Sequence, residues 1–163
     1  MKQNRHSVDI AMMKVARAPD ILYSLGLGSC VGVAIYDPVA RVGGLIHVLL
    51  PSFKEFTQGV HSRTKFADSG IADMVEAMIG AGAKKYNMKA KIVGGAAMFA
   101  TENNQVHNTI GSRNVASCVE TLKKLGIEII AQDVGGNKGR SIFFDLSTGV
   151  LSVRTIEKGE KVI

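Results

Sequence analysis

A glycine-rich turn that ends on a cysteine is the part of this sequence best suited to chemistry. The run Gly26-Leu27-Gly28-Ser29-Cys30 lies between two predicted strands, and its glycines let backbone N–H groups converge beside the projected thiol. Because a thiol is mostly protonated at neutral pH, a nucleophilic cysteine needs a base or a positive field. His47 interrupts an apolar strand, which a turn at Asp37-Pro38 would fold back beside Cys30. The pattern predicts a cysteine nucleophile with a histidine as general base and acid.

A catalytic histidine is normally oriented by a third group. Ser24, on the strand that enters the glycine turn, is the candidate by position, and the backbone of Gly28 and Ser29 is the candidate oxyanion site. Each residue also has an ordinary structural explanation. A histidine in an apolar strand can be a core residue, a cysteine after glycine can be inert, and a strand serine can simply bond backbone or water. The residues alone leave both interpretations open.

Other site chemistries fit the sequence poorly. A Gly-X-Gly-X-X-Gly loop beginning at Gly26 would need glycine where Val31 stands, and a strand pattern follows instead of a helix. The loop 135–139 contains Lys138 but lacks the Gly-Lys-Ser/Thr ending of a P-loop. No Cys, His and Asp spacing matches a zinc site. The other histidines lie near the N-terminus or in predicted polar loops: His6, His61 and His107. We therefore expect neither a metal nor a cofactor.

Two helices are predicted from apolar residues that recur at helical spacing. The first stripe consists of Ile71, Met74, Val75, Met78 and Ile79. The second consists of Val115, Cys118, Val119 and Leu122. Gly126 stands where it could end the second helix. Because Cys118 falls on an apolar stripe, its thiol is expected to be buried in the core.

The rest of the chain reads as strands, which predicts an α+β fold with a largely antiparallel core and flanking helices. Turns at 37–38 and 147–149 would join neighbouring strands as hairpins. Residues 54–64 lack periodicity and are expected to form a surface loop near the site. The predicted strands are Ile21 to Leu25, Val31 to Tyr36, Val42 to Leu50, Lys91 to Phe99, Ile127 to Ala131, Ser141 to Leu146 and Val150 to Arg154.

Length and composition limit the class of protein. The chain has 163 residues, of which 46% are hydrophobic, and a formal net charge of +6. These values predict a single domain over residues 1–163. No apolar run reaches the ~18 residues of a membrane span and no export signal is evident, so we expect a cytoplasmic protein without membrane insertion and with reduced cysteines. Basic residues are dispersed and aromatic residues are only 6% of the chain, which disfavours nucleic acid as a partner.

Several ordered motifs, read together, resemble the CheD family of chemoreceptor glutamine deamidases. They begin with Leu25-Gly26-Leu27-Gly28-Ser29-Cys30-Val31, Tyr36-Asp37-Pro38 and Gly43-Gly44-Leu45-Ile46-His47-Val48-Leu49-Leu50-Pro51. They continue with Lys65-Phe66-Ala67-Asp68, Gly94-Gly95-Ala96-Ala97-Met98-Phe99, Ile110-Gly111-Ser112-Arg113-Asn114 and Asp133-Val134-Gly135-Gly136-Asn137-Lys138-Gly139-Arg140-Ser141. The resemblance spans roughly Leu22 to Arg154.

The resemblance implies a β-sandwich with flanking helices and a cysteine hydrolase that converts glutamines of chemoreceptor cytoplasmic helices to glutamate. By motif position its active-site residues are Cys30, His47 and Ser24, where the family commonly has threonine in place of this serine. The resemblance assigns no role to Arg113 or Arg140. It also implies an alternative function, regulatory binding to a CheC-type phosphatase of the response regulator. These implications are expectations for the structure and the comparisons.

Overall fold

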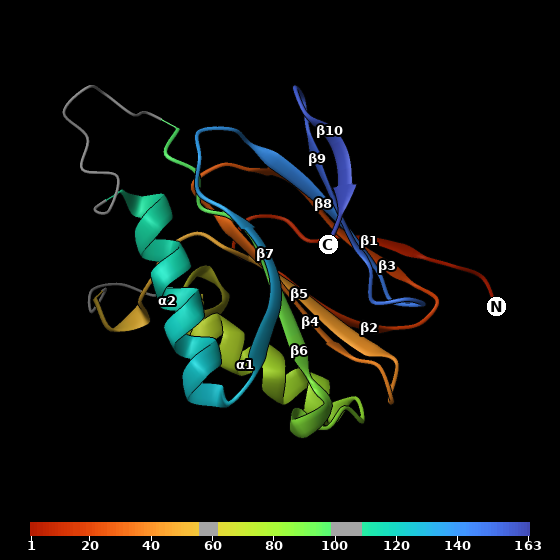
Figure 1. Cartoon of the computed structure of the whole chain (residues 1–163). Coiled ribbons are helices and arrows are strands. Elements are labelled where there is room, and N and C mark those ends of the chain that lie inside the picture. Colours follow the sequence, from red (N-terminus) through yellow and green to blue (C-terminus); the bar gives the residue numbers. More distant parts are fainter. Residues whose placement is uncertain (56–61, 99–108) are drawn as a thin grey trace.

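Two five-stranded β-sheets stack face to face, and two α-helices lie on the outer face of one of them (Figure 1). The computed structural model describes residues 1–55, 62–98 and 109–163. The first sheet has the order β1 (Arg5–Ser7), β3 (Ile21–Leu27), β8 (Arg140–Asp145), β9 (Leu151–Thr155) and β10 (Gly159–Val162). The second has the order β2 (Met13–Arg17), β5 (Val42–Val48), β4 (Val31–Asp37), β6 (Lys89–Gly94) and β7 (Glu128–Val134). The helices are α1 (Ala67–Gly80) and α2 (Ile110–Leu125).

Most strand pairings in the described chain are antiparallel, and both predicted hairpins are present. The turn at 37–38 joins β4 to β5, and the turn at 147–149 joins β8 to β9. The exceptions are β1 with β3 and β6 with β7, which pair in parallel. The second parallel pair is connected through α2, since a parallel connection must cross from one end of the sheet to the other. The α+β class and the largely antiparallel core are therefore confirmed.

The apolar core has two layers, one on each face of the second sheet. Alternate residues of β4 and β5 face the helices, among them Val33 and Ile46, and pack against Ile71 and Met74 of α1. The intervening residues, among them Ala34, face the first sheet. Both layers are buried because the second sheet lies between the helices and the first sheet. Its strands β4 and β5 are accordingly almost continuous runs of buried residues.

Both predicted helices form, with a correction to each apolar stripe. The predicted end of α2 is confirmed, since Gly126 caps it in the left-handed conformation at φ 73°. Cys118 is fully buried on the face of α2 that packs against the sheet, as predicted. However, Ile79 and Val119 are 40% and 38% exposed, so their assignment to the core stripes was wrong. Each lies beside a buried neighbour at the edge of its stripe, where the helix surface turns away from the sheet.

Strand boundaries also differ from the predictions. The strand predicted from Lys91 ends at Gly94, whose φ of 117° leaves the extended conformation, and Phe99 lies outside the described residues. Strand β5 ends at Val48 instead of Leu50. Strands β1, β2 and β10 were not predicted. Residues 56–61 of the predicted surface loop lie outside the described residues, and its flanks form the 3₁₀ helices η1 (Phe53–Glu55) and η2 (Arg63–Lys65). A third 3₁₀ helix, η3, spans Lys85–Asn87.

Candidate active site

Cys30 and His47 lie on the same face of the second sheet, the face that packs against the first sheet. Antiparallel pairing places Gly32 of β4 directly opposite His47 of β5. Since side chains alternate along a strand, Cys30 points to the same face as Gly32 and is a diagonal neighbour of His47. The cysteine belongs to the apolar cluster between the two sheets. The predicted hairpin therefore places the thiol and the imidazole on the same face of the sheet, at diagonal positions.

Gly32 lets the two sheets approach closely beside these residues. A Cβ atom at this position would lie 2.6 Å from Cδ1 of Ile142 and 3.1 Å from Cδ1 of Leu27, both on the first sheet. A larger residue at this position would therefore require the ends of the Ile142 and Leu27 side chains to shift. Across the same contact between the sheets, Ser24 on β3 of the first sheet reaches His47 on β5 of the second.

The imidazole of His47 is 1% exposed, and only one of its two nitrogens has a hydrogen-bond partner among the described residues. Its Nδ1 lies 3.5 Å from Oγ of Ser24, and that hydroxyl donates to the carbonyl oxygen of Val8 at 2.5 Å. Because the Ser24 hydroxyl donates its only proton to the Val8 carbonyl, its oxygen can only accept a hydrogen bond from Nδ1–H of His47. This assigns the proton of the neutral imidazole to Nδ1. The opposite nitrogen, Nε2, is then an acceptor, and it has no hydrogen-bond partner among the described residues.

Burial keeps both groups uncharged in the free protein. It lowers the pKa of His47 below the ordinary value, against a hydrogen bond with the Val8 backbone and the charge of Asp9, which raise it. Burial also raises the pKa of the Cys30 thiol, against a hydrogen bond with its own backbone that lowers it. At neutral pH the pair is therefore a thiol and a neutral imidazole. Such a histidine can accept the thiol proton at the moment of attack.

Two glycines hold the turn that carries Cys30. The N–H of Gly95 donates to the carbonyl oxygen of Cys30, and the N–H of Ala96 donates to that of Gly28, both at 2.9 Å. A Cβ atom at Gly94 would lie 2.3 Å from the Cys30 carbonyl oxygen, and Gly94 and Gly95 have φ angles of 117° and 70°. Only glycine fits such a close approach with this backbone. The Gly94-Gly95 motif therefore supports the turn from the neighbouring strand.

Asn114 is a buried residue near this turn that the sequence reasoning did not single out. From α2, its Nδ2 donates to the carbonyl oxygens of Ser29 and Leu49, each at 3.0 Å. Ser29 directly precedes Cys30, and Leu49 follows the strand that carries His47. One side chain thus ties the cysteine turn to the histidine strand. Its Oδ1 has no hydrogen-bond partner in the described part of the chain.

The two arginines without an assigned role have different surroundings. Arg140 is 8% exposed and donates from Nη2 to the carbonyl oxygen of Gly135 at 2.8 Å, while its Nε lies 3.4 Å from Asp133. Arg113 forms a 2.8 Å ion pair with Glu55, and both side chains are about half exposed. Exposed pairs of this kind contribute little to stability. Arg140 is therefore the arginine that organises buried backbone near the site.

The remaining titratable candidates lie apart from the site. Cys118 is 0% exposed between α2 and the second sheet, and burial raises the pKa of its thiol. His6 is not part of a loose terminus but lies on β1, with Nε2 at 2.8 Å from Asp20. His61 and His107 lie outside the described residues. Among the residues that the structure describes, no group of three or more His, Cys, Asp or Glu side chains could hold a metal ion.

The fold and the site define an α+β sandwich protein with a cysteine and a histidine on one buried face between its sheets. The family model described as CheD chemotactic sensory transduction matches residues 49–155. A Moorella thermoacetica protein named probable chemoreceptor glutamine deamidase CheD is 46% identical, covering 100% of this chain and 98% of that protein. A protein of the same name from Caldanaerobacter subterraneus is 46% identical and covers 96% of each chain. The chain belongs to the CheD family.

Comparison with solved structures gives more distant matches. The Bacillus licheniformis hypothetical protein YfiH matches with a TM-score of 0.49 and 17% identity, covering 74% of this chain and 49% of that one. The helices in the described ranges are too short or too polar to cross a membrane.

Proposed function

We propose that this chain is a chemoreceptor glutamine deamidase with Cys30 as its nucleophile and His47 as its general base and acid. The observation that carries the proposal is the unpartnered Nε2 of buried His47, on the same sheet face as Cys30. A buried polar atom without a partner is rare in a merely structural side chain and is common where a reacting group must be met. The names of the relatives supply the substrate, a glutamine side chain of a chemoreceptor.

The reaction follows from these groups. Nε2 of His47 takes the thiol proton as the Cys30 sulfur attacks the carboxamide carbon, and N–H groups of the turn at Gly28 and Ser29 stabilise the oxyanion. The imidazolium gives its proton to the leaving nitrogen, which departs as ammonia and leaves a thioester. Nε2 then takes a proton from a water molecule as the water oxygen attacks the thioester carbon. The tetrahedral intermediate collapses to release glutamate, and the departing sulfur takes the proton back from His47 to restore the thiol. No cofactor enters any of these steps.

Ser24 acts in this proposal as a positioning residue, because it holds Nδ1–H and leaves Nε2 free for the thiol. We expect Ser24→Ala to lower kcat about tenfold, the effect of one neutral hydrogen bond. Ser24→Thr keeps the hydroxyl and is expected to keep activity, with the added methyl restricting the rotamer. Steady-state kinetics of both variants and the pH profile of Ser24→Ala test this role. Equal activity of Ser24→Ala and the unmodified protein would contradict it, provided both melt at the same temperature.

The dependence of kcat/KM and of thiol alkylation on pH reports the protonation of Cys30 and His47. Burial lowers the pKa of His47, so kcat/KM is expected to fall only as the pH drops below the ordinary histidine value of 6.5, where the imidazole becomes charged. Burial raises the pKa of Cys30, so alkylation of its thiol by iodoacetamide is expected to increase mainly above the ordinary thiol value of 9.0. Alkylation rates and kcat/KM measured across the pH range check both limits.

A preformed thiolate–imidazolium pair would give a different profile. Its thiolate would be present in weakly acidic solution, so rapid alkylation of Cys30 at about pH 5 would contradict the uncharged pair. The pH at which kcat/KM falls and the pH at which alkylation rises are both properties of Cys30 and His47 together, since the charge of each group affects the titration of the other.

The substrate is tested by incubating a purified receptor cytoplasmic fragment with this protein and, separately, with its Cys30→Ala variant. Peptide mass spectrometry then identifies each glutamine converted to glutamate. Conversion by the unmodified protein alone supports the proposal and identifies the target glutamines. If neither protein converts a glutamine, the deamidase proposal fails and regulatory binding to a CheC-type phosphatase becomes the better interpretation.

A further inference from the structure

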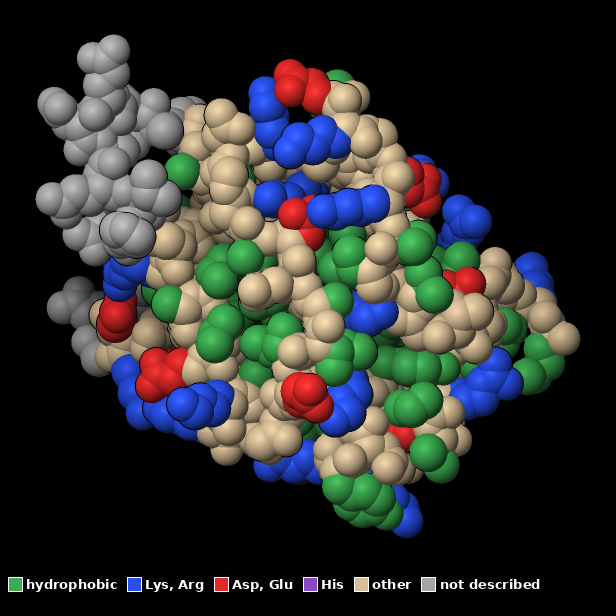
Figure 2. Space-filling view, viewed as in Figure 1, with side chains coloured by type: hydrophobic (Ala, Val, Ile, Leu, Met, Phe, Trp, Pro, Cys, Tyr) green, Lys and Arg blue, Asp and Glu red, His purple; other side chains and the backbone are tan. Residues whose placement is uncertain are grey.

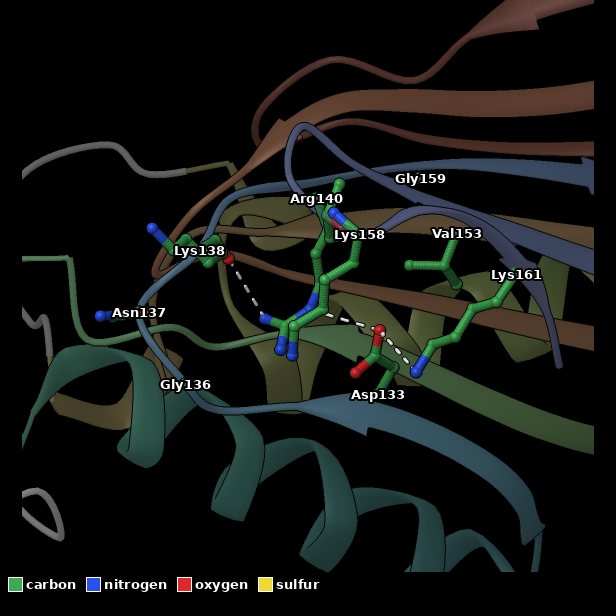
Figure 3. A pocket seen from close by; sticks show the side chains of 10 residues that line it. Asp133, Gly136, Asn137, Lys138, Arg140, Val153, Lys158, Gly159 and Lys161 are labelled. Carbon is green, nitrogen blue, oxygen red and sulfur yellow. Dashed lines mark hydrogen bonds and ion pairs between the residues drawn. The ribbon is translucent and has the colours of Figure 1, made fainter.

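A basic cleft lies at the edge of the sandwich, beside the turn that carries Cys30. It consists of two adjoining cavities of about 130 and 380 Å³ that share Lys138 and Arg140 in their walls. The first cavity is formed where β7, the 136–138 loop and the β9–β10 hairpin meet (Figure 3). The second extends along β8 to Gly26 and Met98. We call the two cavities together the basic cleft.

Positive charge is concentrated along the basic cleft. Its walls contain five cationic side chains and two acidic ones, and one of the cations, Arg154, is paired with Glu160 at 3.0 Å, which leaves an excess of two positive charges in a chain whose net charge is +6. The cationic residues are Lys138, Arg140, Arg154, Lys158 and Lys161, and the acidic residues are Asp133 and Glu157. Figure 2 shows Lys and Arg side chains gathered over β7–β10, with single carboxylates between them. The cleft therefore carries a local field that favours anions.

The acidic residues neutralise only part of this charge. Oδ2 of Asp133 lies 3.4 Å from both Arg140 and Lys161, so one carboxylate is shared by two cations (Figure 3). Lys138 pairs with Glu157 at 3.0 Å, but both side chains are about half exposed or more. Lys158 forms no ion pair with any described residue. Lys158 is thus available to a negatively charged ligand, and so is Lys161, whose side chain is 60% exposed and shares the Asp133 carboxylate with Arg140.

The basic cleft is connected to the cysteine turn through its walls. Met98, in the wall of the second cavity, would lie 3.2 Å from a Cβ atom at Gly28, two residues before Cys30. Arg140 is paired in register with Leu27 and donates to the carbonyl oxygen of Gly94 at 3.5 Å. A protein segment that places a side chain at Cys30 would therefore extend naturally over the cleft.

We propose that the basic cleft binds acidic side chains of the substrate protein that lie next to the target glutamine. This proposal rests on the proposed deamidase function. Charge complementarity supports it, since an excess of cations beside a nucleophile favours an acidic segment over a neutral or basic one. The product of each reaction is a glutamate, so conversion of one glutamine adds a negative charge to the surface that the cleft holds. Earlier conversions should then favour binding at neighbouring glutamines.

The test replaces Lys158 and Lys161 together by glutamine, which keeps most of each stem and removes two charges. Arg140 is left in place because it holds buried backbone. We expect KM for a receptor cytoplasmic fragment to rise about five- to tenfold at low ionic strength, with kcat nearly unchanged and a weaker dependence on salt. The matched control is Lys85→Gln with Lys123→Gln, two exposed lysines on η3 and α2, and its KM is expected to stay unchanged.

A second arm changes the substrate in place of the enzyme. Replacing the glutamates that flank a target glutamine by alanine, which the enzyme cannot deamidate, should raise KM for the unmodified protein and have little effect on the Lys158 and Lys161 double variant. The cleft proposal fails if the double variant keeps its KM, or if the control variant raises KM equally. Alkylation of Cys30 by iodoacetamide at an unchanged rate shows that the turn remains intact in the double variant.

Binding without turnover separates this proposal from the deamidase function. Affinity for the receptor fragment is measured with Cys30→Ala, with and without the Lys158 and Lys161 replacements. If the unmodified protein converts no glutamine but the replacements still weaken binding, the deamidase function fails and the acidic docking site is retained. If conversion proceeds and the replacements alter neither binding nor KM, the docking site fails and the deamidase function is retained.

Discussion

Replacing Cys30 by alanine is expected to abolish deamidation, with a loss of kcat of at least about 10³-fold. Without the sulfur no thioester can form, and His47 alone would have to activate water against an unstrained carboxamide. The loss should be in catalysis and not in folding, because the thiol is small and lies at the rim of the core with 7% exposure. Conversion of receptor glutamines, followed by mass spectrometry over time, measures the effect.

The second cysteine provides the matched control. Cys118 is 0% exposed on the packed face of α2, so Cys118→Ser is expected to keep activity at the cost of some stability, since a hydroxyl replaces a buried thiol. The greater exposure of Cys30 also predicts that iodoacetamide modifies it first. Selective alkylation of Cys118 ahead of Cys30 would contradict the buried placement of Cys118, and full activity of Cys30→Ala would contradict the cysteine mechanism.

Replacing His47 is expected to have the second-largest effect. In His47→Gln the side chain can still bond Ser24, but no group on it can accept the thiol proton near neutral pH, and kcat should fall about 10²- to 10⁴-fold. The acidic limit of the pH profile should disappear with the imidazole. Kinetics and a melting curve of the same preparation measure both consequences.

His47→Ala separates catalysis from packing. It leaves a cavity between the sheets and removes the contact with Ser24, so some loss of melting temperature accompanies the loss of activity. The prediction is that activity falls far more than stability in both histidine variants. A large drop in melting temperature with activity nearly intact would mean that His47 is a core residue whose Nε2 has no chemical role.

The surroundings of the turn determine both the charge and the position of the Cys30 thiol. A buried thiolate would be costly between two apolar sheets, which is why burial raises the pKa of the Cys30 thiol. The turn itself is held from three sides, by Gly95 and Ala96 on the chain after β6, by Asn114 on α2 and, through Gly94, by Arg140 on β8. In the proposed reaction, a thiol held in this way would lower the entropic cost of attack.

The amino-acid sequence by itself predicted the elements whose signal is local. Helical spacing predicted α1 and α2, and Gly126 predicted where α2 ends, because one residue in the left-handed conformation is enough to stop a helix. The hairpin at Asp37-Pro38 predicted that Cys30 and His47 come together, since a short turn determines the register of the two strands that it joins.

The edge strands β1 and β10 of the first sheet carried too little signal to be predicted. Strand β10 is exposed along its whole length and β1 is short and mostly exposed, so neither has the alternation of apolar and polar residues that marks a half-buried strand. Likewise, Gly94 ended β6 earlier than its apolar run suggested, because the left-handed backbone there serves the turn at Cys30 and not the sheet.

Tertiary structure alone decided which groups complete the site. Ser24 reaches His47 from the other sheet, and Asn114 reaches the Ser29 carbonyl from 85 residues away in the chain. The basic cleft likewise combines β7, β8 and the β9–β10 hairpin, whose lysines are dispersed in the sequence. Local patterns report which face of an element is buried, but not which distant element covers it. The contacts that shift the pKa of the buried Cys30 thiol and His47 imidazole depend on which distant element covers them, and this is decided by how the whole chain packs.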